Sequence, residues 1–290
     1  MAGITAGPRY RCPGEAQRVT LMPRIPTNGI HLSYEREGEG DPVLFIMGTS
    51  AGGQVWTTHQ TPALIKSGYH CVTFNNRGVP PSDAPPGKYS LASMVADTKG
   101  LIEALGLGPC HIVGNSLGAL IAQELLIGHR ELVRSAVLIA TKARQDPVRQ
   151  ALARGEQTLI EGGIRVTPHY EAAMTAIQML SPATLNNATA AATWLELFEL
   201  SAETKERVHG QSWADLSSDR REALRSVTTP CRVITFTDDL ITPPYLGAEV
   251  SDAIPDCDLV EISRCGHFGF LERPAETNTA IIEFLDKSRT

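Results

Sequence analysis

The sequence predicts an α/β fold: a mostly parallel central sheet with helices on both faces and a helical segment inserted between two strands. Two observations favour this class. Short apolar stretches with the character of buried strands alternate with longer stretches whose apolar residues recur at helical spacing. This alternation stops between residues 141 and 227, where only helical patterns occur, and then resumes. Strands that alternate with helices in this way form parallel sheets covered by helices.

The first half of the chain is expected to supply most of the sheet. Residues 1–17 are predicted to form a loose lead-in, and the core of the fold is predicted to span residues 18–140 and 228–290. The turn signal Pro26-Thr27-Asn28-Gly29 lies between two alternating stretches and predicts a hairpin. The expected elements are strands at 18–24 and 30–37, a strand at 42–47, a helix at 60–67, a strand at 70–74, a helix at 90–105, a strand from residue 110, a helix at 117–127 and a strand at 135–140.

Residues 141–227 are predicted to be a helical insertion. A helical segment between two sheet strands is typical of a lid over the carboxyl ends of the strands, where open α/β sheets bind ligands. Helices are expected near 147–161, 168–180, 188–200 and 218–225, followed by a strand at 231–236, a helix at 244–253, a strand at 258–262 and a helix at 277–287.

Composition excludes several kinds of partner. The 290 residues carry a formal net charge of −6 and contain no run of lysine or arginine, which argues against nucleic acid and anionic membranes as the main partner. No apolar stretch is long enough to span a bilayer, and the first residues lack the apolar region of a signal peptide. We therefore expect a small-molecule substrate, free or as an acyl group on a carrier. The sequence does not indicate an oligomeric state.

The cysteines indicate a reducing compartment. The chain has six, without a Cys-x-x-Cys pair or another metal-binding spacing, and four of them open or lie inside apolar strand-like stretches. Buried free thiols are therefore expected, which predicts a cytoplasmic protein without a metal site.

The stretch Gly114-Asn115-Ser116-Leu117-Gly118 has the pattern of a nucleophile elbow. An apolar strand precedes it and a helical pattern starts directly after it, so the serine is expected at a sharp turn with its hydroxyl exposed. A second Gly-x-Ser-x-Gly stretch surrounds Ser50, but the residues after Gly52 are poor helix formers. We therefore predict Ser116 as the nucleophile and Ser50 as a loop residue.

A general base and an acid follow later strands. A serine hydroxyl needs a base to take its proton, and the base needs a third group to hold its tautomer. His267 comes directly after the last apolar strand, and Asp239 follows the strand before it. Asp238 and Asp146 are alternative acids, although the proline at position 243 favours Asp239.

These motifs together resemble the α/β-hydrolase superfamily over about residues 30–285. The resemblance rests on the elbow at Ser116, the loop Gly48-Thr49, Asp239 followed four residues later by proline, and Gly266-His267 with Glu272-Arg273-Pro274 beyond. It implies an oxyanion hole formed by the backbone amides of Leu117 and Thr49, and chemistry without a metal or an organic cofactor. The most similar group carries a lid and includes serine esterases, C–C bond hydrolases, cofactor-free haloperoxidases and some thioesterases.

The chain departs from that group around the oxyanion loop. Met47 replaces the usual histidine before Gly48, Asn75 replaces an acidic residue after the fourth strand, Pro80 replaces a later glycine, and Phe236 replaces the glycine three residues before the acid. The usual hydrogen-bond network of this loop is therefore not expected.

The resemblance implies a serine hydrolase that cleaves an ester or thioester of a small to medium organic acid through an acyl-enzyme. Alternatives are a C–C bond hydrolase of a diketone-type substrate, a cofactor-free lyase or acyltransferase of a biosynthetic pathway, and a binding module with an idle triad. The candidate substrate contacts are Gly48, Trp194, Trp213 and Phe268.

Overall fold

The computed structural model describes residues 22–204, 209–216 and 218–289. The predicted lead-in over residues 1–17 and the start of the first predicted strand lie outside these residues. One eight-stranded sheet organises the fold. Its strands are β1 (Arg24–Thr27), β2 (Ile30–Glu37), β3 (Asp41–Ile46), β4 (Tyr69–Phe74), β5 (Cys110–Asn115), β6 (Val133–Ile139), β7 (Cys231–Phe236) and β8 (Cys257–Ile262).

The sheet begins antiparallel and continues parallel. The strand order is β1-β2-β4-β3-β5-β6-β7-β8, and only the pairs β1 with β2 and β2 with β4 are antiparallel. The predicted hairpin forms, but its turn is limited to Asn28 and Gly29, with positive φ angles of 46° and 77°, because Pro26 and Thr27 belong to β1. All six residues of β5 are buried, because helices cover both faces of the sheet at its centre.

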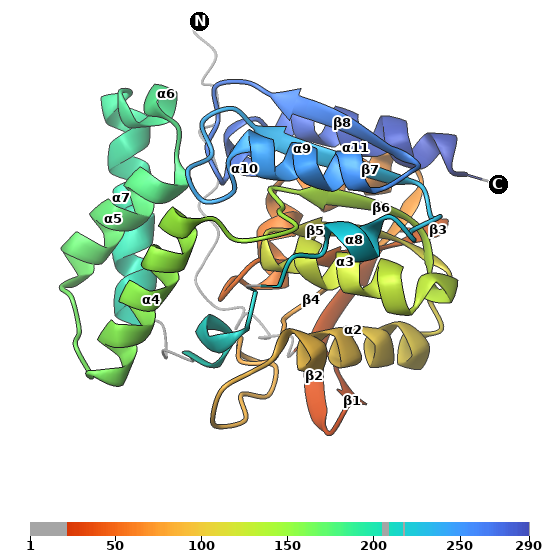
Figure 1. The fold of residues 1–290 in the computed structure, drawn as a ribbon, viewed down its shortest axis with the longest axis horizontal. Helices are drawn as coiled ribbons and strands as arrows, with labels where there is room; N and C mark the ends of the chain where they lie inside the picture. The colour runs from red at the N-terminus through yellow and green to blue at the C-terminus, as the bar shows by residue number, and fades with distance from the viewer. Residues whose placement is uncertain (1–21, 205–208, 217, 290) are drawn as a thin grey trace, which may run out of the picture.

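Helices cover the two faces in separate groups (Figure 1). One hydrophobic cluster joins the sheet to α2, α3, α8 and α9, and a second cluster joins the opposite face to α1, α10 and α11. The predicted fold class is confirmed. The bounds are α1 (Gln60–Lys66), α2 (Leu91–Leu105), α3 (Leu117–Gly128), α8 (Arg221–Leu224), α9 (Pro244–Ala253), α10 (Gly269–Glu272) and α11 (Pro274–Lys287), with 3₁₀ turns at Gly53–Thr58, Arg130–Leu132 and His209–Trp213.

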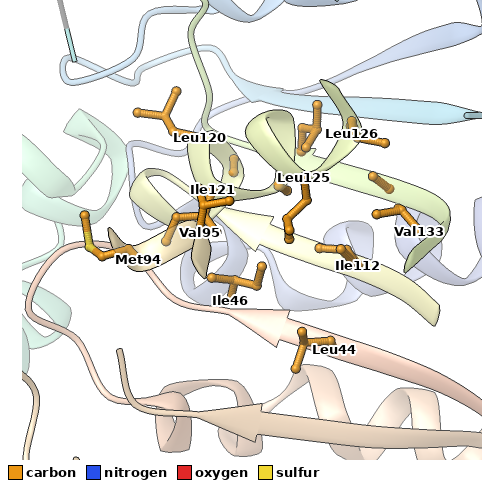
Figure 2. Close-up of a cluster of buried hydrophobic side chains, with 14 of the residues drawn as sticks. Leu44, Ile46, Met94, Val95, Ile112, Leu120, Ile121, Leu125, Leu126 and Val133 are labelled. Atoms are coloured by element: carbon orange, nitrogen blue, oxygen red, sulfur yellow. The ribbon is translucent and has the colours of Figure 1, made fainter. Parts of the chain in front are cut away.

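The first cluster fixes the helix that follows Ser116. Ile121 and Leu125 of α3 pack over Ile46 of β3 and Ile112 of β5, and all four side chains are fully buried (Figure 2). At about 25 cal/mol per Å² of apolar surface removed from water, each such side chain contributes roughly 1.5–3 kcal/mol relative to an exposed one. The start of α3 is therefore held rigidly against the middle of the sheet.

Four further helices lie between β6 and β7 in the sequence. They are α4 (Pro147–Glu161), α5 (Pro168–Met179), α6 (Pro182–Leu185) and α7 (Ala188–Thr204). In Figure 1 they gather beyond the carboxyl ends of the sheet strands. The first three begin alike: Asp146, Thr167 and Ser181 each cap a helix with a side-chain oxygen, and proline occupies the next position. We call α4 to α7 the inserted helices.

Over the residues that the structure describes, none of the helices combines the length and the apolar character needed to cross a membrane.

Candidate active site

Ser116 lies at a sharp turn between β5 and α3. Its φ and ψ angles are 54° and −115°, a region that a residue with a side chain rarely adopts. Two glycines permit the close packing around the turn. A Cβ atom on Gly114 would lie 2.5 Å from the carbonyl oxygen of Gly118, and one on Gly118 would lie 2.1 Å from that of Ile46. The strained serine is typical of a nucleophile elbow.

The amides of Thr49 and Leu117 are available for an oxyanion. Leu117 is the first residue of α3, so its N–H has no partner within the helix. Among the described residues, neither of the two amides donates a hydrogen bond inside the protein. Thr49, Ser116 and Leu117 line one cavity of about 570 Å³. The positive end of the helix and both amides therefore lie beside the same space as the Ser116 side chain.

Asp239 and His267 form a buried pair. His267 Nδ1 lies 2.8 Å from Asp239 Oδ2, and the two residues are 3% and 2% exposed. Asp239 Oδ1 accepts hydrogen bonds from the amides of Ile241 at 2.7 Å and Thr242 at 2.8 Å, and Oδ2 accepts one from the Thr242 hydroxyl at 2.7 Å. The carboxylate is thus fully hydrogen-bonded and fixes the imidazole ring by its Nδ1 atom.

The electrostatics of the pair favour an ionised carboxylate. Burial alone would raise the pKa of Asp239, but the charge and hydrogen bond of His267 and the donors of Thr242 outweigh it, so this pKa lies below its usual value. With Nδ1 donating to the carboxylate, Nε2 of His267 is left as the proton acceptor. Among the described residues, no hydrogen bond joins the Ser116 hydroxyl to His267. Such contacts often tighten only when substrate is bound.

The alternative acids lie elsewhere. Asp146 caps α4, pairs with Arg149 at 2.9 Å and accepts a hydrogen bond from Tyr245 at 2.7 Å. Asp238 accepts a hydrogen bond from the neighbouring Thr237 and is half-buried. Of the three acids named from the sequence, Asp239 is the one that the structure places against His267.

Asparagines and a glutamine support the oxyanion loop in place of the usual network. Asn75 Oδ1 accepts a hydrogen bond from the Gly53 amide at 2.7 Å, and Asn76 Nδ2 donates to the Met47 carbonyl at 3.1 Å. Gln211, which precedes β7 by about twenty residues in the sequence, accepts a hydrogen bond from the Ser50 amide at 2.7 Å. Ser50 is therefore a loop residue of this network, with a φ angle of 58°.

The loop that carries His267 is bound to the inserted helices. The Phe268 amide donates to the Met179 carbonyl at 2.9 Å, and Glu272 accepts hydrogen bonds from the Ser181 amide at 3.0 Å and the Gly266 amide at 2.6 Å. A Cβ atom on Gly266 would lie 2.7 Å from the Met179 carbonyl oxygen, so only glycine permits this close approach. The end of α5 is thereby fixed beside the histidine.

The predicted substrate contacts fall into two places. Trp213 lines the cavity that holds Ser116, and a Cβ atom on Gly48 would lie 3.3 Å from the Cβ of Ser116. Trp194 and Phe268 instead contact each other through their rings, with centroids 6.2 Å apart, and Phe198 packs against both. This aromatic cluster joins α7 to the His267 loop.

Sequence reasoning missed three residues of the site. Thr242 hydrogen-bonds the Asp239 carboxylate and lines the cavity, Gln211 supports the oxyanion loop, and Lys142 lines the cavity directly after β6. Thr242 could have been found from its place three residues after the predicted acid. Nothing in the sequence distinguishes Gln211 or Lys142 from other polar residues of the insertion.

Known proteins with the same fold resemble this chain over most of its length. The family model described as alpha/beta hydrolase fold matches residues 41–274. BpoC of Mycobacterium tuberculosis, whose name designates it provisionally as a non-heme bromoperoxidase, is 41% identical over 256 residues, which are 88% of this chain and 97% of that protein. The crystal structure of BpoC gives a TM-score of 0.85 at 40% identity and covers 89% of this chain and 97% of that one.

More distant proteins share the fold and are named for other activities. A thermophilic esterase from Thermogutta terrifontis, solved with malate bound, gives a TM-score of 0.80 at 25% identity and covers 93% of this chain and 100% of that one. RutD of Azorhizobium caulinodans, named provisionally as a carbamate hydrolase, is 24% identical over 285 residues, which are 91% of this chain and 98% of that protein.

Proposed function

The chain belongs to the α/β-hydrolase fold family, and on that basis we propose that it is a serine hydrolase that cleaves an ester or thioester of a small to medium organic acid. The observation that supports this most is that Ser116 and two amides, which donate to no other described residue, line one cavity. Thr242 lines that cavity and hydrogen-bonds the acid of the Asp239–His267 pair.

In the proposed reaction, Ser116 Oγ attacks the carbonyl carbon while His267 Nε2 takes its proton. Asp239 holds the imidazole by Nδ1 and stabilises its positive charge. The amides of Thr49 and Leu117 donate to the oxygen that becomes negative, an arrangement that lowers such barriers by about 3–4 kcal/mol per donor. His267 then protonates the departing alcohol or thiol, and an acyl-Ser116 ester remains.

Water completes the cycle. His267 accepts a proton from the water molecule as its oxygen attacks the acyl carbon, the bond to Ser116 Oγ breaks, and the proton returns to the serine. The products are the free acid and the original enzyme.

We infer that the inserted helices act as a lid and supply the acyl-binding space. A second cavity of about 780 Å³ adjoins the first, since Leu152, Gln178 and Ser212 line both. Its walls include the apolar side chains of Leu159 and Met174. Such walls suit the hydrocarbon part of a substrate, with Trp213 beside the reacting bond.

The similarity to BpoC supports a second candidate function, the oxidation of bromide with hydrogen peroxide. Hydrogen peroxide can replace water as the nucleophile that attacks the acyl-enzyme, which releases a peracid in place of the acid. A peracid oxidises bromide to hypobromous acid and returns the carboxylic acid. This activity would need the same serine and an added organic acid.

The proposal is tested by ester hydrolysis with purified wild type and Ser116→Ala. With 4-nitrophenyl acetate and butanoate, the variant is expected to lose at least about 10³-fold in kcat/KM, because no acyl-enzyme can form. Ser50→Ala is the matched control and should stay within about threefold of wild type. A Ser116→Ala variant that melts like wild type and hydrolyses esters equally well would refute the assignment.

A further inference from the structure

The chain turns into the reaction cavity directly after β6. Ala140 has a φ angle of 48°, which is rare for a residue other than glycine, and its amide donates to the Ile234 carbonyl at 2.9 Å. The next residues, Thr141 and Lys142, line the cavity that also contains Ser116. Strained backbone of this kind persists where surrounding contacts fix it, and it is common at functional sites.

A buried glutamine holds these two residues relative to the nucleophile. Gln123 Nε2 donates to Thr141 Oγ1 at 2.7 Å and to the Lys142 carbonyl at 3.2 Å. Gln123 is fully buried and belongs to α3, the helix that begins after Ser116. The backbone of Lys142 is therefore fixed to the same helix that positions the serine.

Lys142 differs from three arginines near it. Arg144 pairs with Glu249 at 2.6 Å, Arg149 pairs with Asp146 at 2.9 Å, and Arg220 pairs with Glu124. Among the residues that the structure describes, Lys142 makes no ion pair and its ammonium no hydrogen bond.

The surroundings of Lys142 leave its positive charge poorly compensated. Its side chain is half-buried, and burial lowers the pKa of the ammonium group, an effect that Asp146 and Asp239 oppose only from a distance. A charge removed from water without a partner is costly, so an anion that enters the cavity would be bound favourably. Glu156 and Asp215 also line this cavity, but among the described residues neither forms an ion pair with Lys142. The cavity that Ser116 lines therefore also holds an ammonium group without a bound carboxylate.

We propose that Lys142 is a specificity-determining residue that binds an ionised carboxylate of the substrate. The proposed function supplies the bond that is cleaved, and this inference adds the substrate class: an ester or thioester that carries a second, free carboxyl group in its acyl or its alcohol part. Lys142 recognises that group and takes no part in proton transfer.

Two pairs of matched esters test the inference. Monomethyl glutarate and methyl 5-methylhexanoate differ only in that two methyl groups replace the carboxylate oxygens on the acyl side. Butanoyloxyacetate and isobutyl butanoate differ in the same way on the alcohol side. Because a hydrogen bond to a charged group contributes enough to change binding by about 10- to 100-fold, wild type should prefer the carboxylate in at least one pair by that factor in kcat/KM.

The variants assign the preference to one side chain. Lys142→Met should abolish the preference, measured as the ratio of kcat/KM between the two esters of a pair, and Lys142→Arg should restore part of it. Arg154→Gln removes one charge from the rim of the same cavity, where the guanidinium is exposed and contacts Gln150, and should change the preference less than about threefold. No preference in either pair, or a preference that Lys142→Met leaves intact, would overturn the inference.

A binding measurement separates this inference from the proposed function. Calorimetry with glutarate on Ser116→Ala needs no turnover, and glutarate should bind at least about tenfold more weakly once Lys142→Met is added. Binding that depends on Lys142 in a protein that hydrolyses no ester would support the carboxylate site and refute the hydrolase. If wild type hydrolyses esters but glutarate binds equally to Ser116→Ala with and without Lys142→Met, the hydrolase is supported and the carboxylate site is refuted.

Discussion

At the residue scale, Thr242 explains why Asp239 rather than a neighbouring acid faces His267. Its amide and its hydroxyl each donate to one oxygen of the carboxylate, and the amide of Ile241 adds a third donor. A turn that satisfies the carboxylate in this way holds it ionised and in one orientation. The geometry suits an acid that orients a histidine and stabilises its charge without itself accepting the proton.

This arrangement predicts that Asp-to-Asn substitutions at positions 239 and 146 affect kcat differently. Asp239→Asn should lower kcat for a confirmed ester substrate by roughly 10³- to 10⁴-fold, because an amide at this position favours the wrong histidine tautomer. Asp146→Asn is the matched control. It keeps the helix cap and should stay within about fivefold of wild type. Steady-state kinetics of both variants would identify the acid. A larger loss of kcat in Asp146→Asn than in Asp239→Asn would show that Asp239 has been misassigned.

The catalytic residues predicted from the sequence share one property: each lies within a few residues of a recognisable local pattern. Ser116 has its flanking glycines, His267 follows a glycine and a strand, and Asp239 precedes a proline by four residues. Lys142 and Gln211 have no such signal, because their contacts join segments far apart in the chain, as in the bond between Gln211 and Ser50. Contacts of this kind depend on the folded arrangement and cannot be found from spacing.

At the element scale, β5, the strand that leads to Ser116, contains a buried histidine. His111 is fully buried, and its Nδ1 lies 2.8 Å from Ser135 Oγ on β6. Its Nε2 has no hydrogen-bond partner among the described residues. Burial lowers the pKa of His111 from 6.5 to about 4, with a smaller contribution from Arg134. The strand before the elbow therefore contains a group that stays neutral in the folded protein.

The low pKa of His111 predicts a loss of stability in mild acid. Between pH 6.5 and 4 the unfolded chain binds a proton that the folded chain does not, so the free energy of unfolding falls as the pH falls through this window. The loss from this group is about 2–3 kcal/mol. Urea unfolding at pH 7, 6, 5 and 4 should therefore show a shallower pH dependence for His111→Gln than for wild type. Parallel curves for the two proteins would contradict this account.

The elements themselves were predictable where start signals are local. Four predicted segments have the observed bounds, Ile30–Glu37, Pro147–Glu161, Cys231–Phe236 and Pro244–Ala253. The last helix begins at Pro274 rather than at residue 277, because proline is favoured at the first helical position. Residues Gly53–Thr58 are poor helix formers, yet they form a 3₁₀ helix, because tertiary packing of the buried Trp56 outweighs their weak helix propensity.

At the scale of the whole molecule, buried apolar side chains are concentrated around the sheet and are few in the inserted helices. The sheet and its covering helices hold two large apolar clusters, whereas α4 contains no buried residue and α5 buries only Ala172 and Ala176. The helices α4 and α5 therefore bury few apolar side chains, and the insertion also relies on polar attachments such as those of Ser181 to Glu272 and of Arg149 to the Ile241 carbonyl. Segments with few buried apolar contacts open at low free-energy cost, which is consistent with the lid role that we propose for the inserted helices.

Covalent labelling by a fluorophosphonate, read as intact-protein mass, tests directly whether Ser116 is the nucleophile. Wild type and Ser50→Ala should each gain one adduct, and Ser116→Ala none, because only a serine activated by His267 attacks the phosphorus centre. Peptide mapping should place the adduct on Ser116. Labelling of Ser116→Ala to the same extent as wild type, or its absence in wild type under conditions that label a known serine esterase, would contradict the assignment of Ser116 as the nucleophile.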